Sequence, residues 1–359
     1  CLYIYIYIYI KMSDINSILS DIMLEILNID NIGENASYIP ALAKQDRNIL
    51  GISIMDVDGN MYNIGDHNIQ VPIESISKIF TLALALNKLN IEGIEDKIGL
   101  NPSFLGFDSV LALKLAKNNH VNPFVNNGAM ATTSLIRDIY KDKDWSKIHR
   151  FYNLMANDKL LSKDDITNNS NNDNSNNDDN SFDEKLLYEN DNKYAKTLPL
   201  NNEVFVSETM TNQHNLGLAY LLAGWNSFYA DVPKTVETYT KQCSIMVSSD
   251  NLATMAASIA NNGINPISKK RLIKKCNIKH ILSLMLSNGL YQESGKWSVY
   301  VGVPGKSGVG GGILMVSPGK CGIGIVSPPL NEAGNSYMGW EIAKRLSKKL
   351  KLNVFETYT

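Results

Sequence analysis

The sequence predicts an α+β fold, an antiparallel sheet flanked by helices with an all-helical subdomain inserted into it. Two observations support this prediction. Short runs with the composition of strands lie near the start and in the last third of the 359-residue chain, whereas the middle has mostly helical periodicity. Because the β elements come from both ends, they can share one sheet if the helical middle is an insertion.

The first elements are a predicted helix and a predicted hairpin. Ile and Leu recur at helical spacing in residues 15–27. Residues 50–57 and 61–64 are β-prone and flank Asp58-Gly59-Asn60. An Asp-Gly turn between two such runs is typical of a β-hairpin.

The first 11 residues are not expected to belong to the folded domain. Residues 2–10 alternate Tyr and Ile after Cys1, a run too short to cross a bilayer. We expect residues 1–11 to be a non-native or disordered tail and Met12 to be the natural start.

Residues 71–289 are expected to form the helical subdomain. Residues 107–160 are mostly helical in pattern, and the turn at 122–129 leads into a helix at 129–139. Residues 205–223 indicate a loop followed by a helix, and 236–263 indicate two helices joined near an N-cap sequence.

One stretch of this middle region has the composition of a disordered chain. Residues 168–181 contain only Asn, Asp and Ser, which cannot bury a core. We therefore expect a low-complexity, disordered insert at 163–195.

The last third returns to β-prone runs, at 297–303, 312–316 and 322–326, and ends in a helix with a basic surface at 338–352. The sheet subdomain is therefore expected to comprise about 33–70 and 290–359. Both subdomains belong to one domain spanning 12–359.

Composition excludes several classes of function. The chain has 34 basic and 36 acidic residues and no basic stripe, which argues against nucleic-acid binding. The four cysteines lie far apart without a C-x-x-C pair, and the five histidines lack ligand spacing, so we expect no metal site. No membrane span is expected. A reducing, cytoplasmic location is the simplest expectation, and an organellar location stays open.

The chemistry is expected at Ser75 and Lys78, which share a helix face if the helix begins near Ser75. A lysine whose pKa is lowered by burial can remove the proton of a serine nucleophile. The same spacing also describes a surface lysine one turn from a capping serine, and Ser317 and Lys320 repeat it.

A second cluster, Lys306-Ser307-Gly308, lies on a predicted strand rich in glycine. A phosphate-binding loop would need a glycine where Tyr300 stands, so that interpretation fails. The cluster resembles the Lys-Thr-Gly signature of β-lactamase-like serine enzymes. We expect its positive charge to attract a carboxylate and adjacent amides to complete an oxyanion hole.

Further blocks in the same order make the resemblance specific. From about residue 37 to 339, the chain closely resembles the serine-dependent glutaminases, a β-lactamase-like family with bacterial and animal members. The matching blocks are Tyr38–Ala43, Val57–Asn60, Gly65-Asp66, Ser75–Lys78, Asn126–Ala129, Val206–Glu208, Gln242–Ile245, Gly289–Gly295, Lys306–Val309 and Gly334–Ser336.

The resemblance implies roles for individual residues. Ser75 would be the acylated nucleophile, Lys78 its proton acceptor, and Tyr239 or Tyr291 the residue that carries a proton to departing ammonia. Further positions match residues that bind glutamine or line the family's pocket, with Val309 and Ser75 offering backbone amides to the oxyanion. The substrate-binding set is Tyr38, Ser75, Asn126, Glu208, Asn215, Tyr239, Tyr291 and Val309. The resemblance also implies L-glutamine as the small-molecule partner, no cofactor and a homodimer or homotetramer.

Some positions depart from the family pattern. Glu74 stands where glutamine usually precedes the nucleophile, and its charge is expected to raise the pKa of Lys78. Asn127 and Gly305 each replace an alanine, and residues 101–108 are a degraded version of a family block.

Two other functions remain open at this point. A penicillin-binding or β-lactamase-type hydrolase could claim Ser249-Asp250-Asn251 as a Ser-Asp-Asn motif, although helix capping explains that triplet more simply. A catalytically silent binding protein could keep the same fold, and Glu74 is the residue that most favours that alternative.

Overall fold

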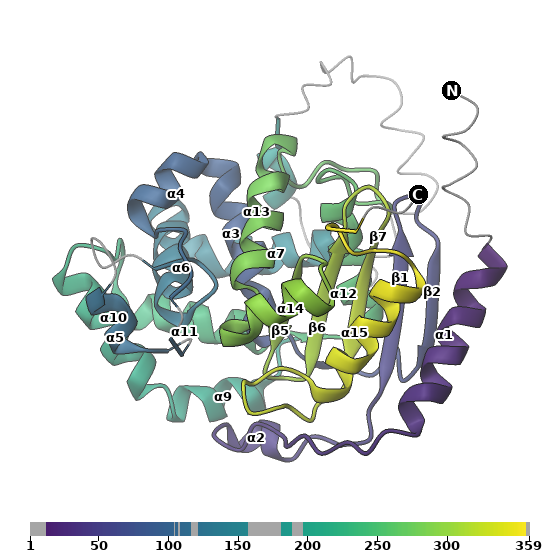
Figure 1. The fold of residues 1–359 in the computed structure, drawn as a ribbon. Coiled ribbons are helices and arrows are strands. Elements are labelled where there is room, and N and C mark those ends of the chain that lie inside the picture. Colours follow the sequence, from purple (N-terminus) through teal and green to yellow (C-terminus); the bar gives the residue numbers. More distant parts are fainter. Residues whose placement is uncertain are drawn as a thin grey trace.

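The computed structural model describes residues 12–103, 105–106, 108–115, 121–156, 181–188 and 197–356. An antiparallel sheet lies beside a larger group of helices (Figure 1). Its strands, in the spatial order β2-β1-β7-β6-β5, are β1 (Gly51–Asp56), β2 (Met61–Gly65), β5 (Gly305–Gly308), β6 (Gly312–Ser317) and β7 (Cys321–Val326). The expected tail at 1–11 lies outside the described residues.

Strands from the two ends of the chain pair at the centre of this sheet. β1 is antiparallel to β7, with Ile52 opposite Ile325 and Ile54 opposite Ile323. The predicted hairpin places β2 outside β1, and β6 and β5 continue the sheet beyond β7. The prediction of one antiparallel sheet built from both ends is confirmed.

Helices cover both faces of the sheet. Ile313 and Met315 of β6 face a core with α1 (Met12–Leu27), α14 (Ser294–Tyr300) and α15 (Tyr337–Lys349). On the other face, α12 (Ser249–Ala260) packs so closely on β7 that a Cβ at Gly322 would lie 2.1 Å from a backbone nitrogen of the helix. Glycine in β7 therefore permits this contact.

Apart from α2, which precedes β1, the remaining helices lie between β2 and β5 in the sequence and form the group beside the sheet (Figure 1). A short pairing of β3 (Val71–Pro72) with β4 (Met246–Val247) links the start and end of this group. The other helices are α2 (Pro40–Ala43), α3 (Ser77–Lys88), α4 (Ile91–Lys97), α5 (Val110–Leu115), α6 (Asn126–Tyr140), α7 (Asp144–Ala156), α9 (Asn202–Met210), α10 (Gln213–Gly224), α11 (Val232–Cys243) and α13 (Lys275–Asn288).

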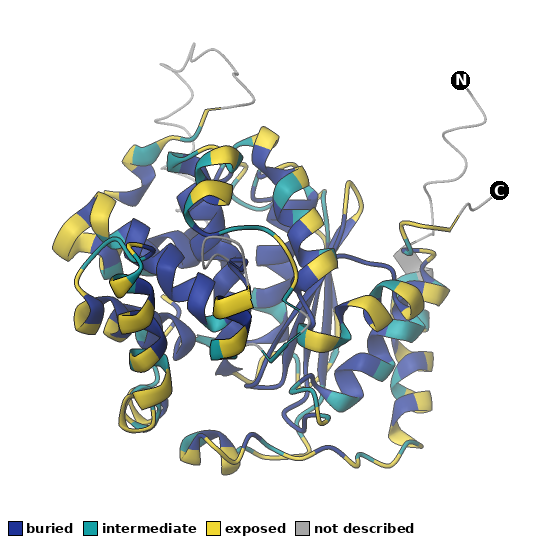
Figure 2. Cartoon of the chain, turned by 60° about the vertical axis from the view of Figure 1, so that its left-hand side comes forward, coloured by how far each residue is buried: buried dark blue, intermediate teal, exposed yellow. Residues whose placement is uncertain are grey.

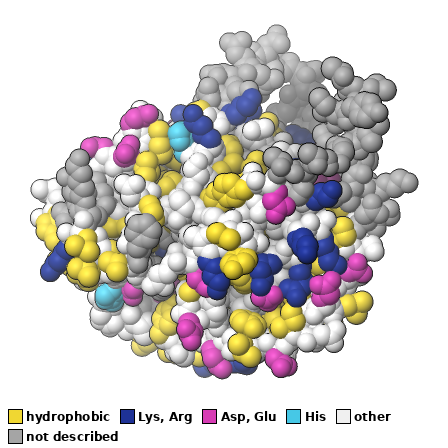
Figure 3. All heavy atoms as spheres, viewed as in Figure 1, with side chains coloured by type: hydrophobic (Ala, Val, Ile, Leu, Met, Phe, Trp, Pro, Cys, Tyr) yellow, Lys and Arg dark blue, Asp and Glu magenta, His cyan; other side chains and the backbone are white. Residues whose placement is uncertain are grey.

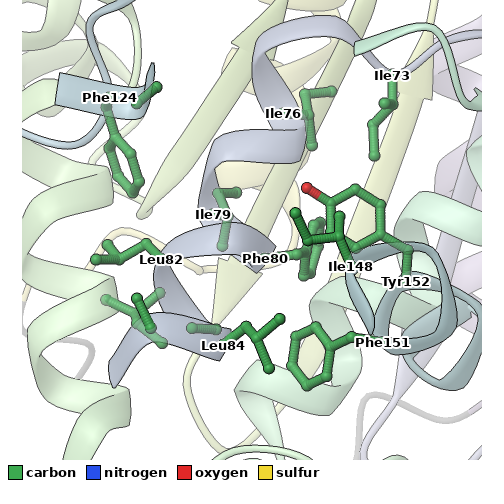
Figure 4. Close-up of a cluster of buried hydrophobic side chains, with 14 of the residues drawn as sticks. Ile73, Ile76, Ile79, Phe80, Leu82, Leu84, Phe124, Ile148, Phe151 and Tyr152 are labelled. Atoms are coloured by element: carbon green, nitrogen blue, oxygen red, sulfur yellow. The ribbon is translucent and has the colours of Figure 1, made fainter. Parts of the chain in front are cut away.

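Helix α3 runs through the centre of the helical group. Every one of its residues except Lys88 is buried, and the interior helices are coloured accordingly in Figure 2. Ile79, Phe80 and Leu82 pack among side chains of α7 and the segment before α6 (Figure 4). A helix that is apolar on all sides is typical of a core position, so this packing holds the N-terminus of α3 in place.

One predicted strand is wrong. Residues 297–303 have strand-like composition, but 294–300 form α14 and the next strand begins at Gly305. Trp297 decides the outcome because it is fully buried, stacks edge-on against Trp340 and donates a 2.7 Å hydrogen bond from Nε1 to the Val303 carbonyl. Tertiary packing overrides strand propensity here.

The expected disorder at 163–195 does not hold throughout that range. Residues 184–187 form a 3-10 turn in which Leu186 and Leu187 are buried against the helical core. The Lys147 ammonium and the Arg150 guanidinium donate hydrogen bonds to their carbonyls. Residues 157–180 and 189–196 lie outside the described part of the chain.

The predicted basic surface of the C-terminal helix is balanced by acidic partners. Figure 3 shows basic and acidic side chains interspersed over the region of α1 and α15. Arg345 pairs with both Glu25 and Glu341, and Lys349 also pairs with Glu25. In the described part of the chain, every helix is too short or too polar to cross a membrane.

Tyr152→Phe tests how α3 is held. The Tyr152 hydroxyl donates a 2.6 Å hydrogen bond to the Ser77 carbonyl and lies 2.7 Å from Thr81 Oγ1, all buried. We expect the substitution to lower the free energy of unfolding by about 1–3 kcal/mol in urea denaturation, because buried polar groups lose a partner. Tyr220→Phe, at an exposed position, is the control and should change stability by less than about 0.5 kcal/mol. Equal effects would contradict this account.

Candidate active site

Ser75 lies in a 3-10 turn, η1 (Glu74–Ile76), immediately before α3. Ser75 and Lys78, predicted to lie on one helix, therefore belong to two consecutive elements: Ser75 to the 3-10 turn and Lys78 to the first turn of α3. Strand β5 lies so close to the turn that a Cβ at Gly308 would be 2.7 Å from the Ile73 carbonyl oxygen. Glu74 has a φ of 49°, a left-handed conformation that is uncommon outside glycine. The nucleophile candidate thus follows a strained residue at the sheet edge.

A cavity of about 200 Å³ opens beside Ser75. Seven of the eight predicted substrate-binding residues line it, and each comes from a different element or loop of the chain. They are Tyr38, Ser75, Asn126, Glu208, Asn215, Tyr239 and Val309. The fold therefore brings together residues that lie up to 271 positions apart (309 − 38) in the sequence.

Tyr291, the eighth residue, does not line the cavity but contacts the side chain of Ser75. Its side chain hydrogen-bonds with Ser75, and its hydroxyl also donates to the Ser307 carbonyl at 3.4 Å. Tyr291 has a φ of 55°, so its backbone is also in the left-handed region. Burial raises the pKa of its phenol above the usual value, which keeps the proton on the hydroxyl at neutral pH.

Lys78 is 1% exposed and contacts the cavity residue Asn126. Its Nζ donates a 2.7 Å hydrogen bond to Asn126 Oδ1. Burial lowers the pKa of the Lys78 ammonium to about 8, and the nearby Glu74 and Glu208 offset only part of that effect. The expectation that Glu74 would raise the pKa of Lys78 is therefore outweighed by desolvation.

Asn126 connects several of the predicted residues. Besides Lys78, its Oδ1 accepts a 3.2 Å hydrogen bond from the Tyr239 hydroxyl, and its Nδ2 donates to Asn215 Oδ1 at 3.1 Å. The expected turn before a helix at residue 129 is wrong, because α6 already begins at Asn126. A Cβ at Gly128 would lie 1.9 Å from the Asn122 carbonyl oxygen, so the glycine allows this early start.

Glu208 and Asn215 also lie on helices rather than on the expected loop. Glu208 belongs to α9 and Asn215 to α10, and the short turn between these helices contains Thr211 and Asn212. Both turn residues line the cavity. The sequence analysis did not assign Thr211 and Asn212 to the site, although their position between the predicted site residues Glu208 and Asn215 could have indicated it.

Cys243 and Glu74 are further cavity residues that were not assigned to the site. Cys243 follows Tyr239 by four residues on α11, so helical spacing places both on one face. Carboxyl oxygens of Glu74 and Glu208 and Cys243 Sγ lie within 4.8 Å of one another. Burial raises the pKa of all three groups. Because protonated groups are poor ligands and the Lys78 ammonium is close, this group is poorly suited to a metal cation.

Lys306 differs from its expected role. Its side chain is fully buried, its Nζ donates a 2.8 Å hydrogen bond to the Ser307 carbonyl, and it lies 4.3 Å from the centre of the Tyr291 ring. Burial lowers its pKa well below the usual value. Lys306 therefore packs against the Tyr291 ring, and its ammonium group does not line the cavity.

The triplet Ser249-Asp250-Asn251 begins α12 and lies away from the cavity lining. Ser248 and Asn251 form a reciprocal capping box at this helix start. Asp250 accepts a 2.6 Å hydrogen bond from Ser53 and pairs with His67 at 2.8 Å. Capping accounts for the triplet, and the β-lactamase-type alternative loses its middle motif.

Comparison with known proteins agrees with this geometry. A family model described as Glutaminase matches residues 33–181 and 175–355. The glutaminase of Colwellia psychrerythraea (strain 34H) is 39% identical over 341 residues, which cover 95% of this chain and 97% of that protein. Glutaminase 1 of Escherichia coli (strain K12) is 38% identical over 326 residues, which cover 91% of this chain and 93% of that protein.

Solved structures show the same similarity. A probable glutaminase, ybaS, superposes with a TM-score of 0.83 at 35% identity, covering 97% of this chain and 100% of that one. A probable glutaminase from Bacillus subtilis, complexed with 6-diazo-5-oxo-L-norleucine, has a TM-score of 0.75 at 27% identity, with coverage of 97% and 98%. The predicted resemblance and the predicted β-lactamase-like α+β fold are both confirmed. The chain belongs to the glutaminase family.

Proposed function

We propose that this protein hydrolyses the side-chain amide of L-glutamine to L-glutamate and ammonia through an acyl-enzyme on Ser75. The observation that carries the proposal is the set of groups at the cavity. Its lining holds a serine, a carboxyl group and two amides, and a buried lysine and a tyrosine contact the lining residues Asn126 and Ser75. The serine, lysine and tyrosine suit amide cleavage, and the carboxyl group and amides suit an amino-acid zwitterion.

The amino-acid end of the substrate is assigned to Glu208, Asn126 and Asn215. The Glu208 carboxylate attracts the α-ammonium, and an amide nitrogen can donate to the α-carboxylate. Asn215 accepts from Asn126 through its oxygen, which turns its own amide nitrogen to another acceptor. Tyr38, half-exposed at the mouth of the cavity, forms a wall beside this end.

In the first step, Ser75 Oγ attacks the side-chain carbonyl carbon of glutamine while neutral Lys78 takes up the hydroxyl proton. The backbone amides of Ser75 and Val309 are proposed to stabilise the oxyanion. The proton held by Lys78 then passes through the Tyr291 hydroxyl to the nitrogen of the tetrahedral intermediate, which expels ammonia and leaves Lys78 neutral. Tyr291 is suited to this relay because it hydrogen-bonds with Ser75.

In the second step, water attacks the ester carbonyl of the glutamyl-Ser75 intermediate. Neutral Lys78 accepts the water proton and returns it to Ser75 Oγ as the ester bond breaks, which regenerates the hydroxyl and the neutral lysine and releases glutamate. The same base therefore serves both halves of the reaction, because each half begins with deprotonation of the attacking hydroxyl group, first of Ser75 and then of water.

A homodimeric or homotetrameric assembly and a cytoplasmic location remain predictions based on the family. Light scattering coupled to size-exclusion chromatography would measure the assembly directly.

Ser75→Ala tests the nucleophile. We expect the wild-type protein to release ammonia and glutamate from L-glutamine in equal amounts, and the variant to lose at least about 10³-fold in kcat. Ser317→Ala, which removes the serine of the other match to the same spacing, is the control and should keep wild-type kcat. Glutamine hydrolysis that survives Ser75→Ala would contradict the mechanism, and acylation by a β-lactam without glutamine hydrolysis would favour the alternative hydrolase.

A covalent probe gives an independent test of the same residue. 6-Diazo-5-oxo-L-norleucine carries a diazomethyl group where glutamine carries its amide nitrogen. We expect mass spectrometry to find one adduct for each chain of the wild-type protein, mapped to Ser75, and none in Ser75→Ala. An adduct on Cys243 instead would assign the nucleophile to the thiol.

The pH dependence tests the base. Lys78 must be neutral to accept a proton, and its pKa is lowered to about 8, so about one-tenth is neutral at pH 7. We expect kcat at saturating glutamine to rise roughly tenfold from pH 6 to pH 7 and to level off above about pH 8. A kcat that is constant over this range would rule out Lys78 as the base.

A further inference from the structure

Glu74 occupies an environment that is unfavourable for a charged carboxylate. It is 3% exposed, and its Oε1 is buried without a hydrogen-bond partner in the described part of the chain. It lines the cavity directly beside Ser75. A carboxylate buried in this way would lose its hydration without compensation, whereas a neutral carboxylic acid loses much less.

A second acid lies close to Glu74 in the cavity. Oxygens of Glu74 and Glu208 lie within 4.8 Å of each other. Two carboxylates this close and this buried repel each other strongly unless one of them takes up a proton. Glu208 is the more exposed of the pair, so the proton is favoured on Glu74.

Of the other titratable groups around this pair, Lys78 supplies a positive charge that lowers the pKa of Glu74, but burial and the charge of Glu208 outweigh it. The hydrogen bond that the Lys78 ammonium makes is to Asn126. The tyrosines and the cysteine keep their protons at pH 7 because desolvation raises the pKa of each. The groups that face the pair are Lys78 from α3, Glu208 from α9, Tyr239 and Cys243 from α11, Tyr291 from the turn before α14, and Tyr38 from the segment before α2.

We propose that Glu74 is a neutral carboxylic acid that donates a hydrogen bond to Glu208 and so leaves Glu208 as the single carboxylate of the cavity. In this role Glu74 is a positioning residue: it orients the Glu208 carboxylate, which is assigned above to the substrate α-ammonium. It also spares Lys78 a second neighbouring negative charge. The assignment of the ammonium rests on the proposed function, but the protonation of Glu74 does not.

The pKa directions agree with this geometry. Burial and then the charge of Glu208 raise the pKa of Glu74 well above its usual value. Burial raises the pKa of Glu208 only to about 7, because interaction with Glu74 and the charge of Lys78 offset part of the effect. As pH falls, Glu208 is protonated too. As pH rises far enough, Glu74 ionises and the pair carries two charges.

Infrared difference spectroscopy of the ligand-free protein tests the proton on Glu74. We expect the wild-type protein at pH 7 to show the C=O stretching band of a protonated carboxylic acid and Glu74→Gln to lack it. Glu208→Gln is the matched control and should keep the band. A band that persists in Glu74→Gln, or that disappears in Glu208→Gln instead, would overturn the proposal. Because no substrate is present, this result is independent of glutamine hydrolysis.

Kinetics test the positioning role. If Glu74 is neutral, Glu74→Gln removes no charge, and the midpoint of the kcat-against-pH curve should stay in place. If Glu74 were ionised, that variant would lower the midpoint by about one pH unit or more, which would contradict the proposal.

A second comparison isolates the hydrogen bond to Glu208. Glutamine at position 74 can still donate to Glu208, whereas leucine of similar size cannot. We expect Glu74→Leu to raise the KM for glutamine about tenfold relative to Glu74→Gln, because a hydrogen bond to a charged group is lost. Equal KM values in two folded variants would overturn the positioning role, and the infrared result stands if Glu74→Leu does not fold.

Discussion

The burial of Lys78 is the constraint on which the site depends. An ammonium group with 1% exposure is stable only if a well-placed acceptor is present, and Asn126 supplies that acceptor from the first turn of α6. Asn126 in turn contacts Tyr239 and Asn215. The contacts of Asn126 that hold the buried lysine therefore also link four helices, α3, α6, α10 and α11, around the cavity.

The sheet and the helical group meet at the turn that carries Ser75. The turn lies against the edge strand β5 on one side and continues into the fully buried α3 on the other. Because Tyr291 comes from the C-terminal part of the chain and hydrogen-bonds with Ser75, distant parts of the sequence meet at one end of the cavity. Such a site exists only when the sheet built from both ends is complete.

Much of the fold could be predicted because local patterns and tertiary packing agree. The Asp58-Gly59 turn, the apolar run of α3 and the strands β6 and β7 formed as their patterns indicate. The prediction failed at 297–303, where one buried tryptophan outweighs strand propensity, and at Asn126, where a glycine lets the helix begin early. In both cases a contact with a distant residue decided the local structure, and no local pattern records such a contact.

The sequence by itself determined the chemical groups of the site and their family order, from Ser75 and Lys78 through Glu208 to Tyr291. Only the tertiary structure decided their charge states and their partners. Glu74 adds a negative charge when its side chain is considered alone, yet it is buried close to Glu208, and burial raises its pKa well above the usual value. Lys306 is likewise withdrawn into the core beneath Tyr291. The physical reason is desolvation: a group's proton affinity depends on what surrounds it, and segments far along the chain supply those surroundings.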